Sequence, residues 1–62
     1  MYEVRETEAG IERVVLVTQE IGEVVRHIEA EGFQFITDIC GSKVFDHADG
    51  RTALARVVPV AK

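Results

Sequence analysis

Cysteine is almost absent from this chain of 62 residues, which has one, Cys40. A single cysteine cannot form an intrachain disulfide, and no Cys and His residues stand at the spacing of a zinc site. A chain this short barely buries enough apolar surface to offset the entropy of ordering it. With neither a bridge nor a metal to supplement the core, the sequence predicts a homodimer or a complex with another protein.

Long apolar runs are also missing. The longest covers residues 14–17, whereas a membrane-spanning helix needs about 20 apolar residues. No basic segment followed by an apolar one marks a signal peptide, and a lone cysteine suits a reducing compartment. We therefore expect a soluble cytoplasmic protein.

Positive charge is scarce as well. The net charge is −4, and residues 1–31 hold eight Glu against three Arg (−5), whereas residues 32–62 hold three Asp against four Lys or Arg (+1). Proteins that bind nucleic acids carry a basic surface that neutralises phosphates. The composition therefore disfavours a nucleic-acid partner and favours another protein, basic or nucleic-acid-binding itself.

The first half of the chain predicts a hairpin followed by a helix. Residues 2–7 alternate in polarity, as a strand with one solvated face does. Residues 11–18 predict a second strand, central in the sheet because its middle is apolar on both faces. Apolar residues then recur at i, i+3, i+4 and i+7, which predicts an amphipathic helix over about 19–31. Thr18 is expected to cap this helix and Gly32 to end it.

Two further strands are expected after the helix. Residues 33–40 alternate in polarity and predict a strand with Phe33 and Phe35 facing the helix. The Gly-Ser pair at 41–42 is then expected to turn the chain into a short strand over 43–48.

The end of the chain completes a single domain over 1–62. Asp49-Gly50 is a two-residue hairpin signal, and residues 52–60 predict a last strand. This strand is expected at an edge or frayed near Pro59, since proline donates no ladder hydrogen bond. The fold class is therefore α+β, β-β-α-β-β-β, with one amphipathic helix packed on an antiparallel sheet. One helix cannot cover both faces, so we expect a second molecule on the other.

Asp46, His47 and Asp49 form the densest group of reactive side chains. A metal site needs ligands that converge, and strand alternation sends Asp46 and His47 to opposite faces. Only Asp46 with Asp49, or His47 with Asp49, could converge, and the turn already accounts for Asp49. The group is therefore interpreted as a hairpin, and we predict neither a metal site nor a cofactor.

Cysteine catalysis is also disfavoured. A nucleophilic Cys40 needs a nearby base, and nothing in the sequence brings His27 or His47 to it. A free cysteine is more typical of a small buried apolar residue. Because no nucleophile, base and oxyanion donor can be assembled, the chain is not predicted to be an enzyme.

Two charged groups are candidate partner-binding sites. The helix surface is either a solvated face or an acidic patch that attracts a basic partner and imitates a phosphate backbone; its residues are Glu20, Glu23, Glu29 and Glu31. The alternative is an RNA-binding surface near Phe45, formed by Lys43, Arg51 and Arg56.

From the helix onward, about residues 20–60, the order of features resembles that of HicA-type toxins, small ribonucleases of toxin–antitoxin systems with a double-stranded-RNA-binding-domain-like fold. The matching features are Gly32-Phe33, Gly41-Ser42, a strand ending at His47, Asp49-Gly50-Arg51 and Val58-Pro59. The resemblance implies a small RNA-binding domain. It implies a degenerate one, because Lys43 stands where the family has its catalytic His and the family's C-terminal helix has no counterpart.

The function predicted from these features is a non-enzymatic protein-binding module. It would be a small acidic inhibitor or regulator of the anti-CRISPR or anti-restriction type that phages and mobile elements encode. The alternative is a degenerate HicA-like RNA-binding domain.

Overall fold

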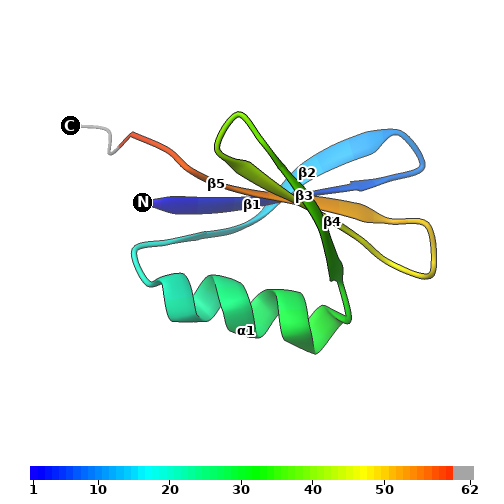
Figure 1. Cartoon of the computed structure of the whole chain (residues 1–62), viewed down its shortest axis with the longest axis horizontal. Helices are drawn as coiled ribbons and strands as arrows, with labels where there is room; N and C mark the ends of the chain where they lie inside the picture. Colours follow the sequence, from blue (N-terminus) through cyan, green and yellow to red (C-terminus); the bar gives the residue numbers. More distant parts are fainter. Residues whose placement is uncertain (60–62) are drawn as a thin grey trace.

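A computed structural model describes residues 1–59 as one antiparallel sheet with a helix lying across one face (Figure 1). The elements are β1 (Tyr2–Glu8), β2 (Ile11–Thr18), α1 (Ile21–Glu31), β3 (Gln34–Ile39), β4 (Ser42–Asp46) and β5 (Thr52–Val57). The five strands stand in the order β2-β1-β5-β4-β3, so that α1 connects the two edge strands. The predicted α+β class and element order are confirmed.

Helix α1 forms where its apolar periodicity predicts. Gly32 ends it in the left-handed conformation, with φ of 81°, and donates to the Glu29 carbonyl oxygen at 3.1 Å, as C-terminal caps do. Glu20, not Thr18, is the N-cap residue; the Thr18 hydroxyl accepts the Glu20 N–H at 3.0 Å and holds the turn before the helix. At 11 residues, α1 is too short to cross a bilayer.

Two of the hairpins turn on a pair of residues with positive φ. These pairs are Ala9-Gly10 (52° and 79°) and Cys40-Gly41 (52° and 82°), the pattern of the type I′ turn, whose twist matches that of the strands. The predicted turn at Gly41-Ser42 is therefore wrong by one residue, because Ser42 already pairs with Ile39. Cys40 lies exposed at the tip of this turn and is not the small buried residue that we expected.

The β4–β5 connection is longer than predicted. Asp46 pairs with Thr52, and the His47 N–H donates to the Arg51 carbonyl oxygen at 3.0 Å. The loop therefore consists of residues 48–50, not of Asp49-Gly50 alone. Only its last residue, Gly50, has positive φ (95°), as in three-residue hairpin loops with a bulge glycine.

The positions of β5 and β2 in the sheet differ from the prediction. β5 is the central strand, not an edge, and its pairing ends at Val57, before Pro59; residue 60 lies outside the described residues. β2, predicted to be central, is an edge strand on which Val14 and Val17 are exposed. Its apolar run reflects a bulge, because the unpaired Val15 packs with Leu16 against the core.

The core is small and lies between α1 and the middle of the sheet. Its buried apolar residues are Val4, Val24, Ile28, Phe33 and Ala53. The opposite sheet face carries ion pairs beside apolar side chains. Arg5 bonds Glu3 at 2.7 Å and Glu12 at 2.8 Å, and Arg56 bonds Glu3 at 3.0 Å. Val14, Leu54 and Val44 lie in the same row of this face as Arg5.

The β3–β4 hairpin diverges from the helix. α1 lies closest to β1 and β2, and Figure 1 shows the hairpin rising away from it. Phe35 is consequently 57% exposed and packs edge-on against Phe45, with 5.8 Å between ring centroids. Of the two phenylalanines expected to face the helix, only Phe33 is buried in the core.

The positive φ of Ala9 generates a stability prediction. Ala9→Asn should raise the free energy of unfolding by about 0.5–1 kcal/mol, because asparagine tolerates the left-handed region and is preferred in this turn. Ala48→Asn is the control, since Ala48 is an exposed hairpin residue without positive φ. Urea unfolding measures both, and equal effects would contradict the turn geometry.

Candidate functional site

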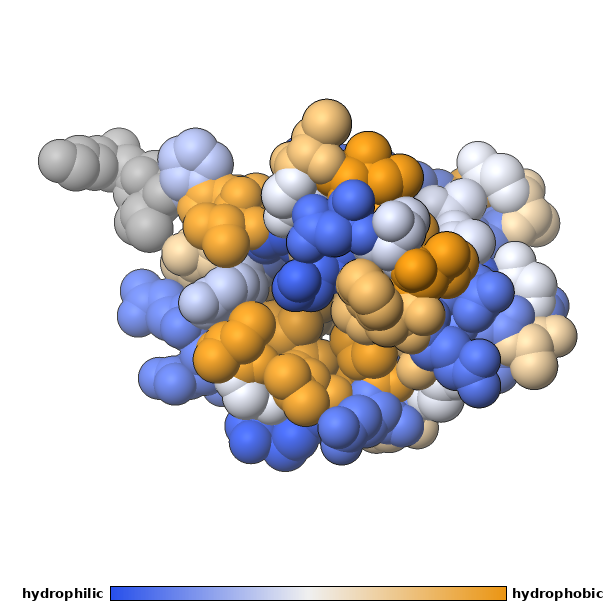
Figure 2. Space-filling view, in the orientation of Figure 1, coloured by the Kyte–Doolittle hydropathy of each residue, from blue (hydrophilic) through white to orange (hydrophobic). Residues whose placement is uncertain are grey.

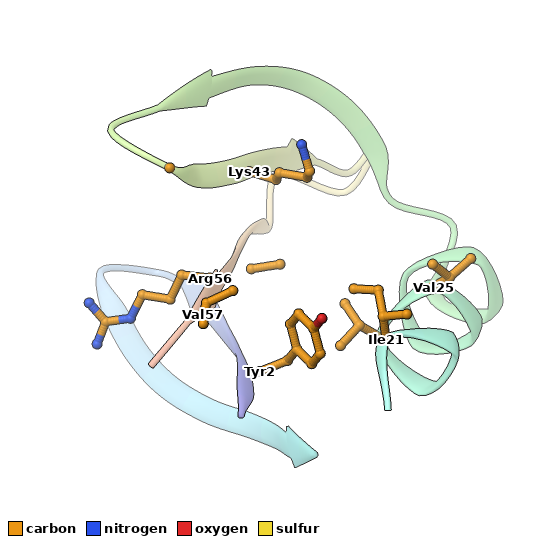
Figure 3. Close-up of a pocket in the computed structure, with 9 residues that line it drawn as sticks. Tyr2, Ile21, Val25, Lys43, Arg56 and Val57 are labelled. Carbon is orange, nitrogen blue, oxygen red and sulfur yellow. The ribbon is translucent and has the colours of Figure 1, made fainter. Parts of the chain in front are cut away.

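An apolar cavity of about 260 Å³ lies where α1 and the β3–β4 hairpin diverge. Ile21, Val24 and Val25 of α1 form one wall, as Figure 3 shows for the labelled Ile21 and Val25. Tyr2, Ala55 and Val57 line it from β1 and β5. Figure 2 shows apolar side chains around a hollow above α1 on this face of the molecule. We call this feature the apolar groove.

The groove exists because its residues are too small and too few to close it. β5 presents Ala53 and Ala55 to the helix; Ala53 is buried under α1, whereas Ala55 lies beneath the cavity. Ile21 and Val57 remain 54% and 69% exposed at its margins. Covering such exposed apolar side chains with a partner is favourable by about 25 cal/mol per Å² of apolar surface removed from water.

Two cations stand at the margin of the groove and point out of it. The Lys43 ammonium donates to Asp38 Oδ2 at 3.1 Å and lies 5.7 Å from the Phe35 ring centroid. Arg56 reaches Glu3 on the other sheet face. Figure 3 shows both side chains directed away from the cavity, so that the cavity itself offers almost no charge to a ligand.

A polar cluster closes the opposite end of α1. Glu6 of β1 is 6% exposed, and His27 Nε2 donates to its Oε2 at 2.9 Å. Arg51, just before β5, places one NH1 at 3.3 Å from Glu6 Oε1 and 3.4 Å from Glu31 Oε1. The guanidinium also lies over the Phe33 ring, 5.2 Å from its centroid. We call Glu6, His27, Glu31 and Arg51 the polar cluster.

His47 ties the β4–β5 loop to the end of α1. Its Nε2–H donates to the Glu31 carbonyl oxygen at 2.7 Å, and its Nδ1 accepts the Asp49 N–H at 3.0 Å. Nδ1 also lies 2.9 Å from Asp49 Oδ1. Asp46 instead pairs with Gln34 and Thr52 in the sheet ladder.

Arg51 sets the ionisation of Asp49. The Arg51 N–H donates to Asp49 Oδ1 at 3.0 Å and its Nε to Oδ2 at 2.8 Å. The backbone hydrogen bond first, and then the guanidinium, lower the pKa of the Asp49 carboxyl, and the same contact raises the pKa of Arg51. The side chains of Asp49 and His47 thus hold the loop, and His47 also joins it to the end of α1.

The helical glutamates do not gather on one side. Nine residues separate Glu20 from Glu29, which at about 100° per residue places them on opposite flanks of the helix. Glu31 is bonded to Arg51, while Glu20, Glu23 and Glu29 are exposed and form no ion pair within residues 1–59. Most of the unpaired charge of α1 is therefore negative.

The cations of the alternative RNA-binding surface are dispersed. Lys43 and Arg56 stand at the margin of the groove, whereas Arg51 lies in the polar cluster at the other end of α1, and each is bonded to at least one carboxylate.

The histidines and the cysteine lie at opposite ends of the sheet. Cys40 precedes β4 and His47 follows it, so the strand separates them by about 17 Å at 3.4 Å per residue. His27 bonds Glu6 in the polar cluster. No described base therefore reaches the thiol.

Comparison of the chain with protein-family models, curated proteins and solved structures finds no match. The resemblance to HicA-type toxins stays a prediction, and the function is inferred from the residues themselves.

The lowered pKa of Asp49 predicts a pH-dependent stability. Since the folded-state pKa lies below the ordinary value of 3.8, the carboxylate stabilises the fold above that pH, and the contribution is lost as the pH falls through the folded pKa. Asp49→Asn should therefore lower the free energy of unfolding at pH 7 and have a smaller effect below pH 3.8. Urea unfolding across this range measures the difference.

Asp46→Asn is the matched control for this experiment, because Asp46 forms no ion pair among residues 1–59. An Asp49→Asn effect that stays constant across the acid range, or that equals the effect of Asp46→Asn, would contradict the role given to Arg51.

Proposed function

We propose that this chain is a non-enzymatic protein-binding module whose apolar groove receives an apolar segment of a basic partner protein. The observation that carries the proposal is the exposure of Ile21, Val25 and Val57 around one cavity. A domain this small has little apolar surface to spare. Such residues gathered around a hollow are typical of an interaction site.

The size of the cavity favours a protein side chain as its occupant. Sites for small molecules generally measure about 300–1,000 Å³, and this cavity measures about 260 Å³. Binding between proteins is commonly dominated by a few apolar or aromatic anchors that fill pockets of the partner. One large apolar side chain, with its neighbours resting on Ile21 and Val25, suits both the volume and the lining.

The net charge of α1 indicates which residues flank the anchor in the partner segment. Helix α1 with its N-cap residue carries four Glu and one Arg, a net charge of −3 with His27 neutral, and the whole chain carries −4. Opposite charges across an interface speed association and select the partner. A segment flanked by Lys or Arg complements the negative charge of this helix. A second copy of the chain would bring the same acidic helix and meet repulsion.

A basic, nucleic-acid-binding protein is the kind of partner that this combination suits. The module then acts as a small acidic inhibitor or regulator of that protein. The pairing of Lys43, Arg51 and Arg56 with carboxylates supports a protein partner over RNA.

The groove proposal is tested by peptide selection. From a random displayed-peptide library, the protein should select sequences with an apolar anchor beside Lys or Arg. Val25→Asp should weaken their binding by at least tenfold, because it places a carboxylate in the apolar wall. Val14→Asp is the matched control, since Val14 and Val25 are each 48% exposed but Val14 lies on edge strand β2. Fluorescence anisotropy measures the affinities.

Failure to select any peptide, or equal losses in both variants, would contradict the groove as the binding site. Light scattering of the wild-type protein decides between a foreign partner and a second copy. We expect a monomer, and a dimer that Val25→Asp dissociates would assign the groove to a second copy.

The exposed glutamates of α1 and its N-cap residue generate a separate prediction. Reversing Glu20, Glu23 and Glu29 to Lys should lower the affinity for the selected peptides strongly at low salt, and less at 0.5 M salt, where exposed charges are screened. Circular dichroism should show an unchanged fold, because these residues are exposed and unpaired within the described part of the chain. If the variant binds the peptides as tightly as the wild type at low salt, attraction by these glutamates is contradicted, but the groove as the binding site is not.

A further inference from the structure

Three metal-ligating side chains meet in the polar cluster, at the end of α1 away from the apolar groove. A carboxylate oxygen of Glu6, an imidazole nitrogen of His27 and a carboxylate oxygen of Glu31 all lie within 4.8 Å of one another. The proposed binding of a protein segment in the groove uses none of them.

The backbone brings these ligands to one point. His27 and Glu31 are four residues apart and so project from the same side of α1, one turn from each other. Glu6 rises from β1, directly beneath that turn, and contacts His27. Because two ligands sit on a helix and the third on a paired strand, their relative positions are set by the packing of α1 on the sheet.

The centre of the cluster favours a positive charge. Glu6 is 6% exposed, and a buried carboxylate is costly unless cations or hydrogen-bond donors surround it. Arg51 NH1 stands between the two glutamates at 3.3 and 3.4 Å. Both distances exceed the 2.7–2.9 Å typical of charge-assisted bonds, whereas Arg51 Nε lies 2.8 Å from Asp49 Oδ2. The guanidinium is thus held firmly by Asp49 and loosely by the cluster.

We propose that Glu6, His27 and Glu31 form a binding site for a divalent transition-metal ion of the Zn²⁺ class. The ion takes the position between the carboxylates, and Arg51 NH1 moves aside while its Nε stays on Asp49. The His27 proton, which Nε2 donates to Glu6 in the metal-free protein, moves to Nδ1, so that Nε2 coordinates the ion through its lone pair. One imidazole and two carboxylates are ligands that Zn²⁺ accepts, and three protein ligands leave a fourth position for water or a ligand from another molecule. The imidazole selects Zn²⁺ over Mg²⁺ and Ca²⁺, which prefer oxygen ligands.

Binding requires a small adjustment of the cluster. Ligand atoms about 2.1 Å from a tetrahedral zinc ion lie about 3.4 Å apart. His27 Nε2 and Glu6 Oε2, 2.9 Å apart, therefore open slightly, and all three ligand atoms already lie within 4.8 Å of one another. Glu31 is exposed, so its side chain can move toward Glu6 and His27 without disturbing the core.

The test is calorimetric titration of the protein, free of any His tag, with ZnCl₂, followed by titration with CoCl₂ monitored by visible absorption. We expect one ion per chain at micromolar affinity and a Co²⁺ spectrum of four-coordinate type. His27→Gln should weaken binding at least tenfold, and Glu6→Gln and Glu31→Gln should do the same. Arg51→Gln should tighten binding, because it removes the competing positive charge.

Glu29→Gln, on the other flank of α1, and Cys40→Ser are the controls and should leave the affinity unchanged. Circular dichroism of each variant separates loss of a ligand from loss of the fold; if Glu6→Gln unfolds the chain, the more accessible His27 and Glu31 variants decide. Absence of Zn²⁺ binding at 100 μM ion, or binding that survives His27→Gln and is lost in Cys40→Ser, would overturn the proposal.

Discussion

A single helix has to cover one face of a five-stranded sheet, and the rest of the structure depends on that constraint. Helix α1 runs alongside β1 (Figure 1) and is about 10–12 Å across with its side chains, while five strands spaced about 4.8 Å apart span about 19 Å between their outer axes. The helix packs closest to β1 and β2 and leaves β3 and β4 partly uncovered. The apolar groove is the space that this mismatch produces, and it opens where β5 presents Ala55.

The two ends of the helix are fixed by different interactions. At its C-terminal end, Gly32 reverses the chain, Phe33 enters the core and His47 bonds the Glu31 carbonyl oxygen. These contacts hold helix, loop and sheet together. At its N-terminal end, only the turn held by Thr18 joins helix and strand, and the side chains of Ile21 and Val25 meet a hollow. The C-terminal end of the helix is thus held by more contacts than its N-terminal end.

Paired and unpaired charges lie on different parts of the molecule. Arg5 and Arg56 pair with glutamates across the outer sheet face. Exposed ion pairs contribute little to stability, but they keep an open sheet face polar. Much of the unpaired negative charge lies on α1 and its N-cap residue, on Glu20, Glu23 and Glu29, spread around the helix.

The sequence by itself determined the elements, their order and the α+β class, because hydrophobic periodicity and glycine positions are local properties of the chain. Some features of the candidate site could also be read from the sequence, namely the apolar face of the helix and the glutamates on its surface. Only the tertiary structure decided that β5 is central, that Val15 forms a bulge, that turns shift by one residue, and that Glu6 meets His27. The central place of β5 and the contact of Glu6 with His27 depend on pairing and packing between residues distant in sequence. The bulge and the shifted turn depend on the register of two hairpins, for which the local pattern allows several arrangements.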